Sequence, residues 1–424
     1  MRRVSARTGL ACALLTLGAI SCCHADIVQQ ILAHVPAQAY SYAQVATELS
    51  SLDSSSDRVS VVRLGRSHGG RDILCAAVHD PQTIFGQTRC LFIIGRLHGN
   101  EPSGTSACMA LIRHFATAGG AVERETLRRL TLVFVPMSNP DGADSGRRSN
   151  AKGVDLNRDW QSRSQPETQA IDRAVKVWQP DALMDLHELP ASSSKPSYRE
   201  NFVETIGRGP GITSMCSTVS AGASYDIARW MRAYGYRFNI YYDGPGKDRR
   251  LCHRRFGLDL GIPSFLMEAK TGAGRDIRYR CGFHVVGALT VANYLICGAG
   301  LPGAPQMAAT EGPADNLAAE SRPSAGRTSR VELRLVQAME ALEGESEAVE
   351  AVVSGSQPVR YVKFYLDGRL WLVTNNEPYQ CPMDPADVGE GAHQVDVTVI
   401  GETGEVLASA TGRVNIGPVQ AAGR

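Results

Sequence analysis

The chain has 424 residues, of which 43% are hydrophobic and 21% charged, and its formal net charge is +1. This composition is typical of a globular protein and excludes an intrinsically disordered chain. The near-zero charge argues against a dedicated nucleic-acid-binding protein, because such proteins carry a clear basic excess. The length predicts two or three domains.

The first 25 residues have the pattern of a signal peptide. Three arginines precede a short apolar run at 9–20, and small residues follow it. Residues 1–25 contain no acidic residue. We therefore expect export to the periplasm or out of the cell, with residues 1–25 removed. Lipoprotein anchoring through Cys22 is less favoured, because residues 19–21 make a poor acylation motif. No other stretch predicts a transmembrane segment.

Cysteine usage fits an exported protein. Three of the 11 cysteines fall within residues 1–25, so eight remain in the mature chain. An even number in an oxidising compartment favours some disulfides, although the sequence does not define which cysteines pair.

Residues 26–299 predict one α/β domain. Short apolar runs indicate buried strands at 90–95, 132–135, 182–185 and 265–267, and helical patterns occur at 106–115 and 166–178. Strands and helices that alternate along the chain predict a largely parallel sheet flanked by helices.

The composition changes near residue 300. Residues 300–330 are rich in proline, alanine and serine, which indicates a linker. Residues 331–424 then hold several short β segments and the hairpin signal Asp367-Gly368, which predicts a small all-β sandwich. Its sequence resembles the immunoglobulin-like domains appended to bacterial exported enzymes. Such a domain docks on its neighbour or contacts the cell wall, and both roles remain open.

Two of the predicted strands are followed by metal-binding residue types. His98 and Glu101 lie three residues apart in the loop after residues 90–95, and His187 follows the strand at 182–185. Two imidazoles and one carboxylate form a ligand set that suits zinc and leaves one position open for water. The three residues together therefore predict a zinc site.

Two further groups of residues could carry chemistry. Arg148, Asn157 and Arg158 offer donors for a carboxylate and for a developing oxyanion, with Asp155 beside them. Glu268 ends the apolar strand at 265–267, where it is either a surface acid or a general base.

The order of these residues resembles that of the zinc metallocarboxypeptidase family of carboxypeptidase A. The matching elements are His98-x-x-Glu101, Asn139-Pro140-Asp141-Gly142, Asp155-Leu156-Asn157-Arg158, Pro166-Glu167, His187 and Glu268. Carboxypeptidase A is itself a known His₂Glu zinc enzyme. The resemblance implies a mixed sheet between helices with the site at strand ends.

The resemblance also implies a role for each matching residue. His98, Glu101 and His187 would bind one zinc ion, and Asp155 would orient His98. Asn157 and Arg158 would bind the terminal carboxylate of a peptide, and Arg148 would polarise the scissile carbonyl. Glu268 would act as general base toward a zinc-activated water. The expected substrate is therefore a peptide with a free C-terminal carboxylate.

One family feature does not align securely. Many members close a tyrosine over the substrate; here Tyr241 or Tyr242 is the candidate, and we expect Tyr242. A basic run at 249–255 follows, and it indicates either a solvated loop or a pocket for acidic side chains such as those of peptidoglycan stem peptides.

Two other functions remain open. One is a zinc-dependent deacylase of N-acyl amino acids, similar to succinylglutamate desuccinylase and aspartoacylase. The other is a catalytically inactive binding protein on the same scaffold. The predicted export and the complete set of Arg148, Asn157 and Arg158 favour the peptidase.

Overall fold

The structure is a computed structural model that describes residues 26–83, 86–193, 200–297, 329–337, 347–383, 388–402 and 405–417. Two predicted segments fall outside these residues, namely the signal segment 1–25 and nearly all of the linker 300–330. The predicted export signal therefore stays a prediction.

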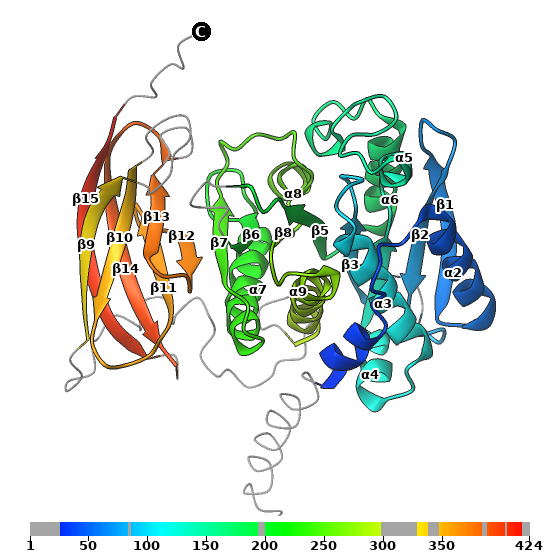
Figure 1. Ribbon diagram of the computed structural model, residues 1–424, viewed down its shortest axis with the longest axis horizontal. Coiled ribbons are helices and arrows are strands. Elements are labelled where there is room, and N and C mark those ends of the chain that lie inside the picture. The colour runs from blue at the N-terminus through cyan, green and yellow to red at the C-terminus, as the bar shows by residue number, and fades with distance from the viewer. Residues whose placement is uncertain are drawn as a thin grey trace, which may run out of the picture.

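Eight strands of the first domain form one sheet in the order β1-β2-β4-β3-β5-β8-β6-β7 (Figure 1). They are β1 (Val59–Arg66), β2 (Asp72–Val78), β3 (Arg89–Gly95), β4 (Leu130–Val135), β5 (Ala182–Leu189), β6 (Asn201–Ile206), β7 (Phe238–Asp243) and β8 (Ser264–Lys270). The pairs β3–β4, β3–β5, β5–β8 and β6–β7 are parallel, whereas β1–β2, β2–β4 and β6–β8 are antiparallel. The sheet is mixed and mostly parallel, which confirms the expected α/β fold.

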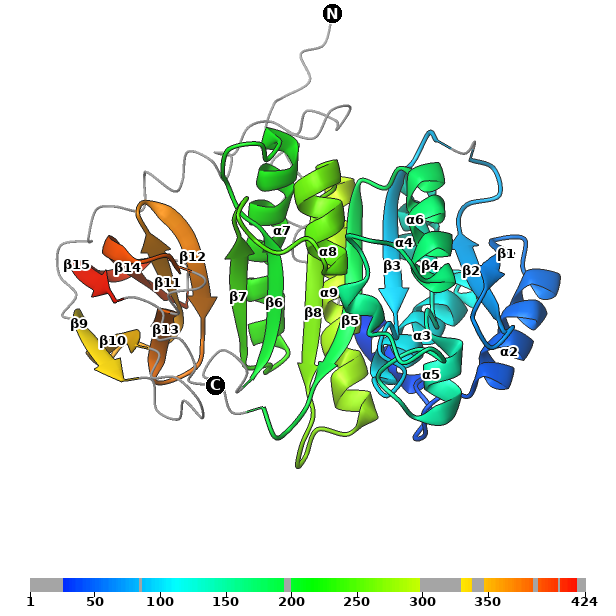
Figure 2. The same cartoon turned by 90° about the horizontal axis from the view of Figure 1, so that it is seen from above.

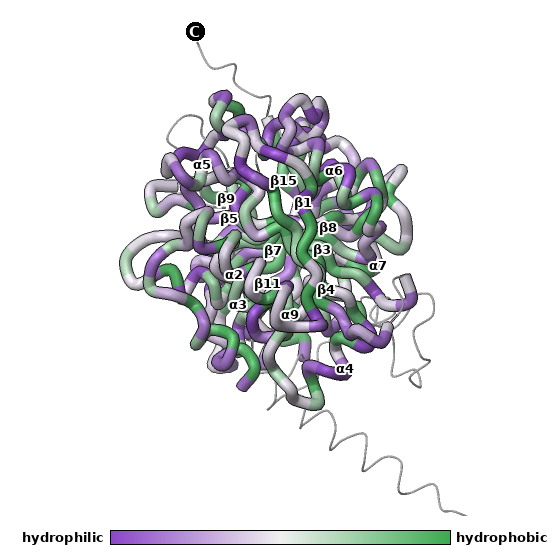
Figure 3. The backbone as a smooth tube through the Cα atoms, turned by 90° about the vertical axis from the view of Figure 1, so that its right-hand side faces the viewer, coloured by the Kyte–Doolittle hydropathy of each residue, from purple (hydrophilic) through white to green (hydrophobic). Residues whose placement is uncertain are grey.

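Helices cover both faces of this sheet. They are α2 (Tyr42–Ser55), α3 (Ser103–Thr117), α4 (Ala121–Arg129), α5 (Pro140–Ser145), α6 (Pro166–Trp178), α7 (Ser214–Ala233), α8 (Cys252–Arg254) and α9 (Ile277–Cys297). Helices α3, α7 and α9 lie on one face and α6 and α8 on the other (Figure 2). Side chains of the first three helices contribute to one hydrophobic core and those of α6 and α8 to a second. The central strands are buried on both sides, which explains their continuous apolar runs. In Figure 3, strands β3 and β8 are coloured largely green, for hydrophobic residues, and lie toward the middle of the molecule.

Helix α9 is long and apolar enough to cross a membrane by length and composition alone. Most of it is nevertheless buried inside the fold, where it packs against α3 and α7. Its apolar character therefore serves the core of the first domain.

The C-terminal strands form two sheets around a shared core. One sheet contains β11 (Val359–Leu366), β12 (Arg369–Thr374), β14 (Gly391–Gly401) and β15 (Val406–Ile416), and the other contains β9 (Arg330–Gln337), β10 (Glu347–Ser354) and β13 (Tyr379–Met383). Two facing sheets with side chains in one core are compatible with the predicted β-sandwich. The aromatic ring of Tyr379 is buried in this core rather than presented at the surface.

The C-terminal domain continues the sheet of the first domain. Residues 372–374 of β12 pair antiparallel with residues 239–241 of β7, so a single 12-stranded sheet runs through both domains (Figures 1 and 2). Arg232 of α7 donates hydrogen bonds of 2.8 Å to the carbonyl oxygens of Val359 and Arg360. Tyr361, Val373 and Ile400 also join the core of the first domain. The second domain is therefore docked through backbone pairing and apolar packing.

The eight described cysteines are all free thiols, and seven of them are buried. Burial raises the pKa of Cys75 and Cys216 to about 12. The expectation of disulfides is therefore wrong for this structure, because these cysteines serve as small apolar side chains of the core.

We expect a chain that ends at Cys297 to unfold at a lower temperature than the full chain and to self-associate. Loss of the C-terminal domain would leave β7 as an unpaired edge strand. It would also uncover apolar side chains that β11, β12 and β14 now cover. Thermal unfolding and sedimentation velocity measure both effects, with Arg232→Ala as a milder variant of the same interface. A truncated chain that stays monomeric with an unchanged melting temperature would contradict this account.

Candidate metal centre and active site

Three buried side chains from separate segments meet at one point. His98 lies in the loop after β3, Glu101 ends that loop before α3, and His187 lies inside β5. The Nδ1 atoms of the two imidazoles are 2.9 Å apart, and Glu101 places one oxygen 2.8 Å from each of them. The structure therefore brings together the three residues that the sequence predicts as zinc ligands.

The loop that carries His98 and Glu101 has two local constraints. Arg96 has a positive φ of 60°, and its buried guanidinium donates from Nε to the carbonyl oxygen of Gly99 at 2.9 Å. Gly99 packs so closely on the next loop that a Cβ atom would lie 2.0 Å from the carbonyl carbon of Gly142. Only glycine fits there, and this close approach brings the backbone of Arg148 against the metal-binding loop.

A carboxylate holds the outer nitrogen of each imidazole. His98 Nε2 is 3.0 Å from Asp155 Oδ1, and His187 Nε2 is 3.0 Å from Asp185 Oδ1. Carboxylates in these positions fix the protonated nitrogen as Nε2 and leave the Nδ1 lone pair directed at the centre. The structure places Asp155 as the sequence predicts.

The sequence analysis missed the role of Asp185. The signal was the spacing Asp185-Leu186-His187, because residues two apart in a strand point to the same face of the sheet. Two nitrogens and a carboxylate form a donor set that fits zinc, and within the described ranges no fourth side chain joins the cluster.

Glu268 lies beside this cluster. It sits inside β8, directly opposite His187 in the register with β5, and its Oε2 atom is buried with no hydrogen-bond partner in the described part of the chain. Burial raises the pKa of Glu268 to about 8, and His187 opposes this rise. The nearby carboxylates of Glu101 and Glu204 raise the pKa further.

Arg148 and Arg158 lie at the edge of the site with exposed guanidinium groups. Arg148 contacts Glu101 Oε1 at 3.2 Å and Asp155 Oδ2 at 3.0 Å, and 43% of its side chain is exposed. Arg158 is exposed and donates one hydrogen bond to the backbone carbonyl oxygen of Asn157. Both cations remain accessible to a substrate.

Asn157 lies directly beside His187. Its side chain is buried, with Nδ2 at 3.1 Å from His187 Nε2 and Oδ1 accepting from the backbone N–H of Cys252 at 2.8 Å. Oδ1 thus holds the start of α8, whereas Nδ2 lies beside a ring nitrogen that already carries a proton; the predicted contact of Asn157 with a substrate carboxylate stays a prediction.

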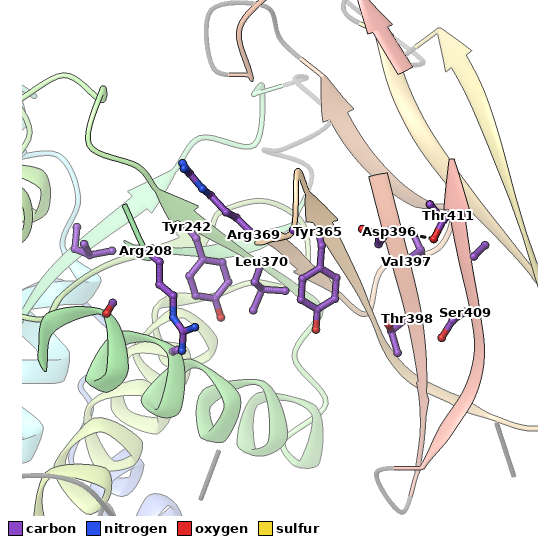
Figure 4. A pocket seen from close by; sticks show the side chains of 16 residues that line it. Arg208, Tyr242, Tyr365, Arg369, Leu370, Asp396, Val397, Thr398, Ser409 and Thr411 are labelled. Carbon is purple, nitrogen blue, oxygen red and sulfur yellow. Dashed lines mark hydrogen bonds between the residues drawn. The ribbon is translucent and has the colours of Figure 1, made fainter. Parts of the chain in front are cut away.

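The prediction that Tyr242 closes over the substrate is wrong. Tyr242 is buried in the core on the α7 face, and it lines a cavity of about 490 Å³ between the two domains, together with Tyr365 (Figure 4). Side chains alternate along β7, so Tyr241 instead faces the side of the sheet that carries Glu268, where its ring packs 6.0 Å from that of Phe202.

The basic run at 249–255 is neutralised by carboxylates. Arg249 and Arg255 contact Asp259, Arg250 contacts Asp248, and Arg254 contacts Asp243 and Glu204. The hypothesis of a free positive pocket for acidic side chains is therefore not supported. Glu204, Asp243 and His253 are close enough to hold a metal ion, but the guanidinium of Arg254 already supplies a positive charge to both carboxylates.

Comparisons with known proteins agree with this site. Residues 46–191 match the sequence model of the zinc carboxypeptidase family. This part of the chain is similar to that family. The matched segment includes His98, Glu101 and His187, whereas Glu268 lies beyond it.

Two similar curated proteins bear the name carboxypeptidase 2. Carboxypeptidase 2 of Trichophyton tonsurans is 30% identical over 182 residues, which is 41% of this chain and 33% of that protein. The probable carboxypeptidase 2 of Arthroderma benhamiae is 30% identical over 101 residues, or 24% of this chain and 19% of that one. The chain thus spans a third or less of the length of these curated relatives.

Two solved structures share the fold of the first domain. A metallo-carboxypeptidase from Burkholderia cenocepacia aligns with a TM-score of 0.51 and 22% identity, covering 61% of this chain and 69% of the other. A metallo-carboxypeptidase from Pseudomonas aeruginosa, in complex with (2-guanidinoethylmercapto)succinic acid, aligns with a TM-score of 0.50 and 22% identity, covering 61% and 70%.

We expect Asp155→Asn and Asp185→Asn each to weaken zinc binding by about 10- to 100-fold, because each removes the carboxylate that orients one imidazole. Competition titration against a chromophoric chelator measures the affinity. Asp172→Asn is the control, since Asp172 is also buried but pairs with Lys176 on α6. If Asp155→Asn and Asp185→Asn bound zinc as tightly as Asp172→Asn, the role of the two carboxylates would be contradicted.

We also expect a pH-dependent stability from Asp243. Burial raises its pKa, but hydrogen bonds from His253 and the charge of Arg254 outweigh burial and lower it to about 2. The folded pKa lies below the ordinary value near 4, so Asp243 stabilises the fold above that pH and loses this effect as the pH falls toward 2.

Urea unfolding of metal-free protein at several pH values measures this effect. The difference in unfolding free energy between the native chain and Asp243→Asn should narrow as the pH falls from about 4 to about 2. A difference that is independent of pH across this range would show that the charge of Asp243 is not involved.

Proposed function

We propose that the protein is a zinc-dependent carboxypeptidase that hydrolyses the C-terminal peptide bond of peptides. The observation that carries the proposal is the convergence of His98 Nδ1, His187 Nδ1 and the Glu101 carboxylate beside Glu268. The family match of residues 46–191 supports the same reading.

His98, Glu101 and His187 would hold one zinc ion, which when bound supplies a Lewis acid for the scissile carbonyl and for water. The chain supplies the rest of the site. Asp155 and Asp185 hold the two imidazoles, and Arg148 holds one oxygen of Glu101. The ligands are therefore oriented before any ion binds.

Glu268 is the proposed general base. A buried carboxylate beside the ligand cluster, with one oxygen that has no partner among the described residues, is suited to take a proton from water. The same carboxyl group can then return the proton to the leaving amine. Glu268 would thus act first as a base toward water and then as an acid toward the leaving amine.

Two arginines define how the substrate would lie. Arg148 sits beside the ligand Glu101, so its positive charge can oppose the negative charge that develops on the carbonyl oxygen. Arg158 is exposed next to the site and can bind a terminal carboxylate. Such an anion exists only at a chain end, which supports removal of single C-terminal residues.

The other two candidate functions are not favoured. A deacylase of N-acyl amino acids would share the metal ligands, but the family match and the similar proteins are carboxypeptidases. A binding protein without activity would have no need for Glu268 and Arg148 beside a complete ligand set. Peptidoglycan stem peptides remain one proposed substrate, and contact of the C-terminal domain with the cell wall is likewise a proposal.

We also propose that the protein is exported. The support is the basic and apolar pattern of residues 1–25. N-terminal sequencing of protein from the periplasm or medium should begin near Asp26, whereas an intact Met1 terminus on cytoplasmic protein would contradict export.

We expect Glu268→Gln to lower kcat by about 10²- to 10⁴-fold with little change in zinc content, because it removes the base without removing a ligand. Mass spectrometry of the products from ordinary peptides, stem peptides and N-acyl amino acids measures both rate and specificity. Loss of single C-terminal residues by the native chain, abolished by a zinc chelator, is the expected result. Release of acyl groups alone would contradict the proposal and favour the deacylase.

A further inference from the structure

A buried carboxylate lies directly behind the metal-binding cluster. Glu188 follows His187 in β5, so its side chain points to the opposite face of the sheet. Only 5% of Glu188 is exposed. A buried charge of this kind is stable only when groups of the protein compensate it.

Glu188 contacts the chain at two points around the ligand Glu101. Its backbone N–H donates to Glu101 Oε2 at 3.0 Å, and its own Oε1 accepts from the backbone N–H of Ser103 at 2.5 Å. Ser103 is the first residue of α3, and Pro102 at the N-cap offers no side-chain cap. Glu188 therefore takes the place of the missing cap and ties the start of α3 to β5.

Arg280 supplies the opposite charge. Its Nε lies 3.1 Å from Glu188 Oε2, and both side chains are largely buried. Arg280 belongs to α9 and is itself held by a hydrogen bond from Nη1 to the carbonyl oxygen of Arg275. The pair thus joins α9, β5 and the start of α3 beneath the cluster.

The negative charges of Glu101 and Glu188 repel each other. The backbone hydrogen bond, the helix N-terminus and Arg280 together offset this repulsion. Without them, the loop of Glu101 could move away from the two imidazoles.

We propose that Glu188, with Arg280 as its counter-ion, is a positioning residue that holds Glu101 in the orientation in which it binds zinc. The inference rests on the proposed zinc site and concerns what keeps that site rigid. Glu188 faces away from the side of the sheet that carries His187, so it acts only through Glu101 and the start of α3.

The test compares Glu188→Ala with the native full-length chain after loading with zinc. Glu123→Ala is the matched control, because Glu123 is also buried and lies 3.1 Å from His114, near the other end of α3. We expect Glu188→Ala to release zinc to a chelator about 10- to 100-fold faster and to change the visible spectrum of the Co²⁺-substituted protein. Glu123→Ala should leave both readouts unchanged, even where its melting temperature falls as much.

Glu188→Gln separates charge from shape. Its amide oxygen can still accept from Ser103, so zinc release should be intermediate between the native chain and Glu188→Ala. If Glu188→Ala does not fold, Glu188→Gln combined with Arg280→Met carries the same test, since neither charge is then left unpaired; faster zinc release is again expected.

Native rates of zinc release and an unchanged cobalt spectrum in the Glu188 variants would overturn the inference, as would equal effects in Glu123→Ala. Zinc content of the native chain is measured first. A native chain that does not bind zinc refutes the proposed function, and the inference fails with it, whereas zinc-loaded native protein with unaffected variants refutes the inference alone.

Discussion

Two imidazole nitrogens and a carboxylate meet within hydrogen-bond distance in the interior of this protein, and the rest of the site depends on that contact. Two lone pairs and a negative charge repel each other in a low-dielectric site unless a cation lies between them. A proton or a metal ion can serve, but the chain adds a carboxylate behind each imidazole, which increases the negative charge around the centre. This arrangement is suited to a divalent ion rather than to a single shared proton.

The fold supplies the three ligands from rigid elements. β5 carries His187 within the sheet, and the loop between β3 and α3 carries His98 and Glu101. Gly99 lets the neighbouring loop approach closely, and this approach delivers Arg148 to the same point. The C-terminal domain extends the sheet at its far edge through β7 and β12, so it stabilises the framework, and none of its described residues contributes a ligand to the cluster.

Much of this could be predicted from the sequence, because the strands at residues 90–95 and 132–135 are continuous apolar runs and the ligands lie near the ends of strands. The errors have physical causes. Strand alternation decides whether Tyr241 or Tyr242 faces the site, and one residue of register separates the two. The engagement of Asn157 by Cys252 and the pairing of Arg254 with Asp243 are contacts between distant segments, which local sequence patterns do not encode. Glu188 lies next to a predicted ligand, but its side-chain partners Ser103 and Arg280 are on α3 and α9. Asp185 was missed although its partner His187 lies two residues away on the same strand.

The central claim is that His98, Glu101 and His187 bind zinc together. X-ray absorption at the zinc edge of the purified full chain tests it most directly. The account predicts one zinc ion per chain with two imidazole nitrogens at about 2.0–2.1 Å and oxygen as the remaining scatterers. Sulfur scattering at about 2.3 Å, which would place zinc on cysteines instead, or the absence of stoichiometric zinc, would contradict the account.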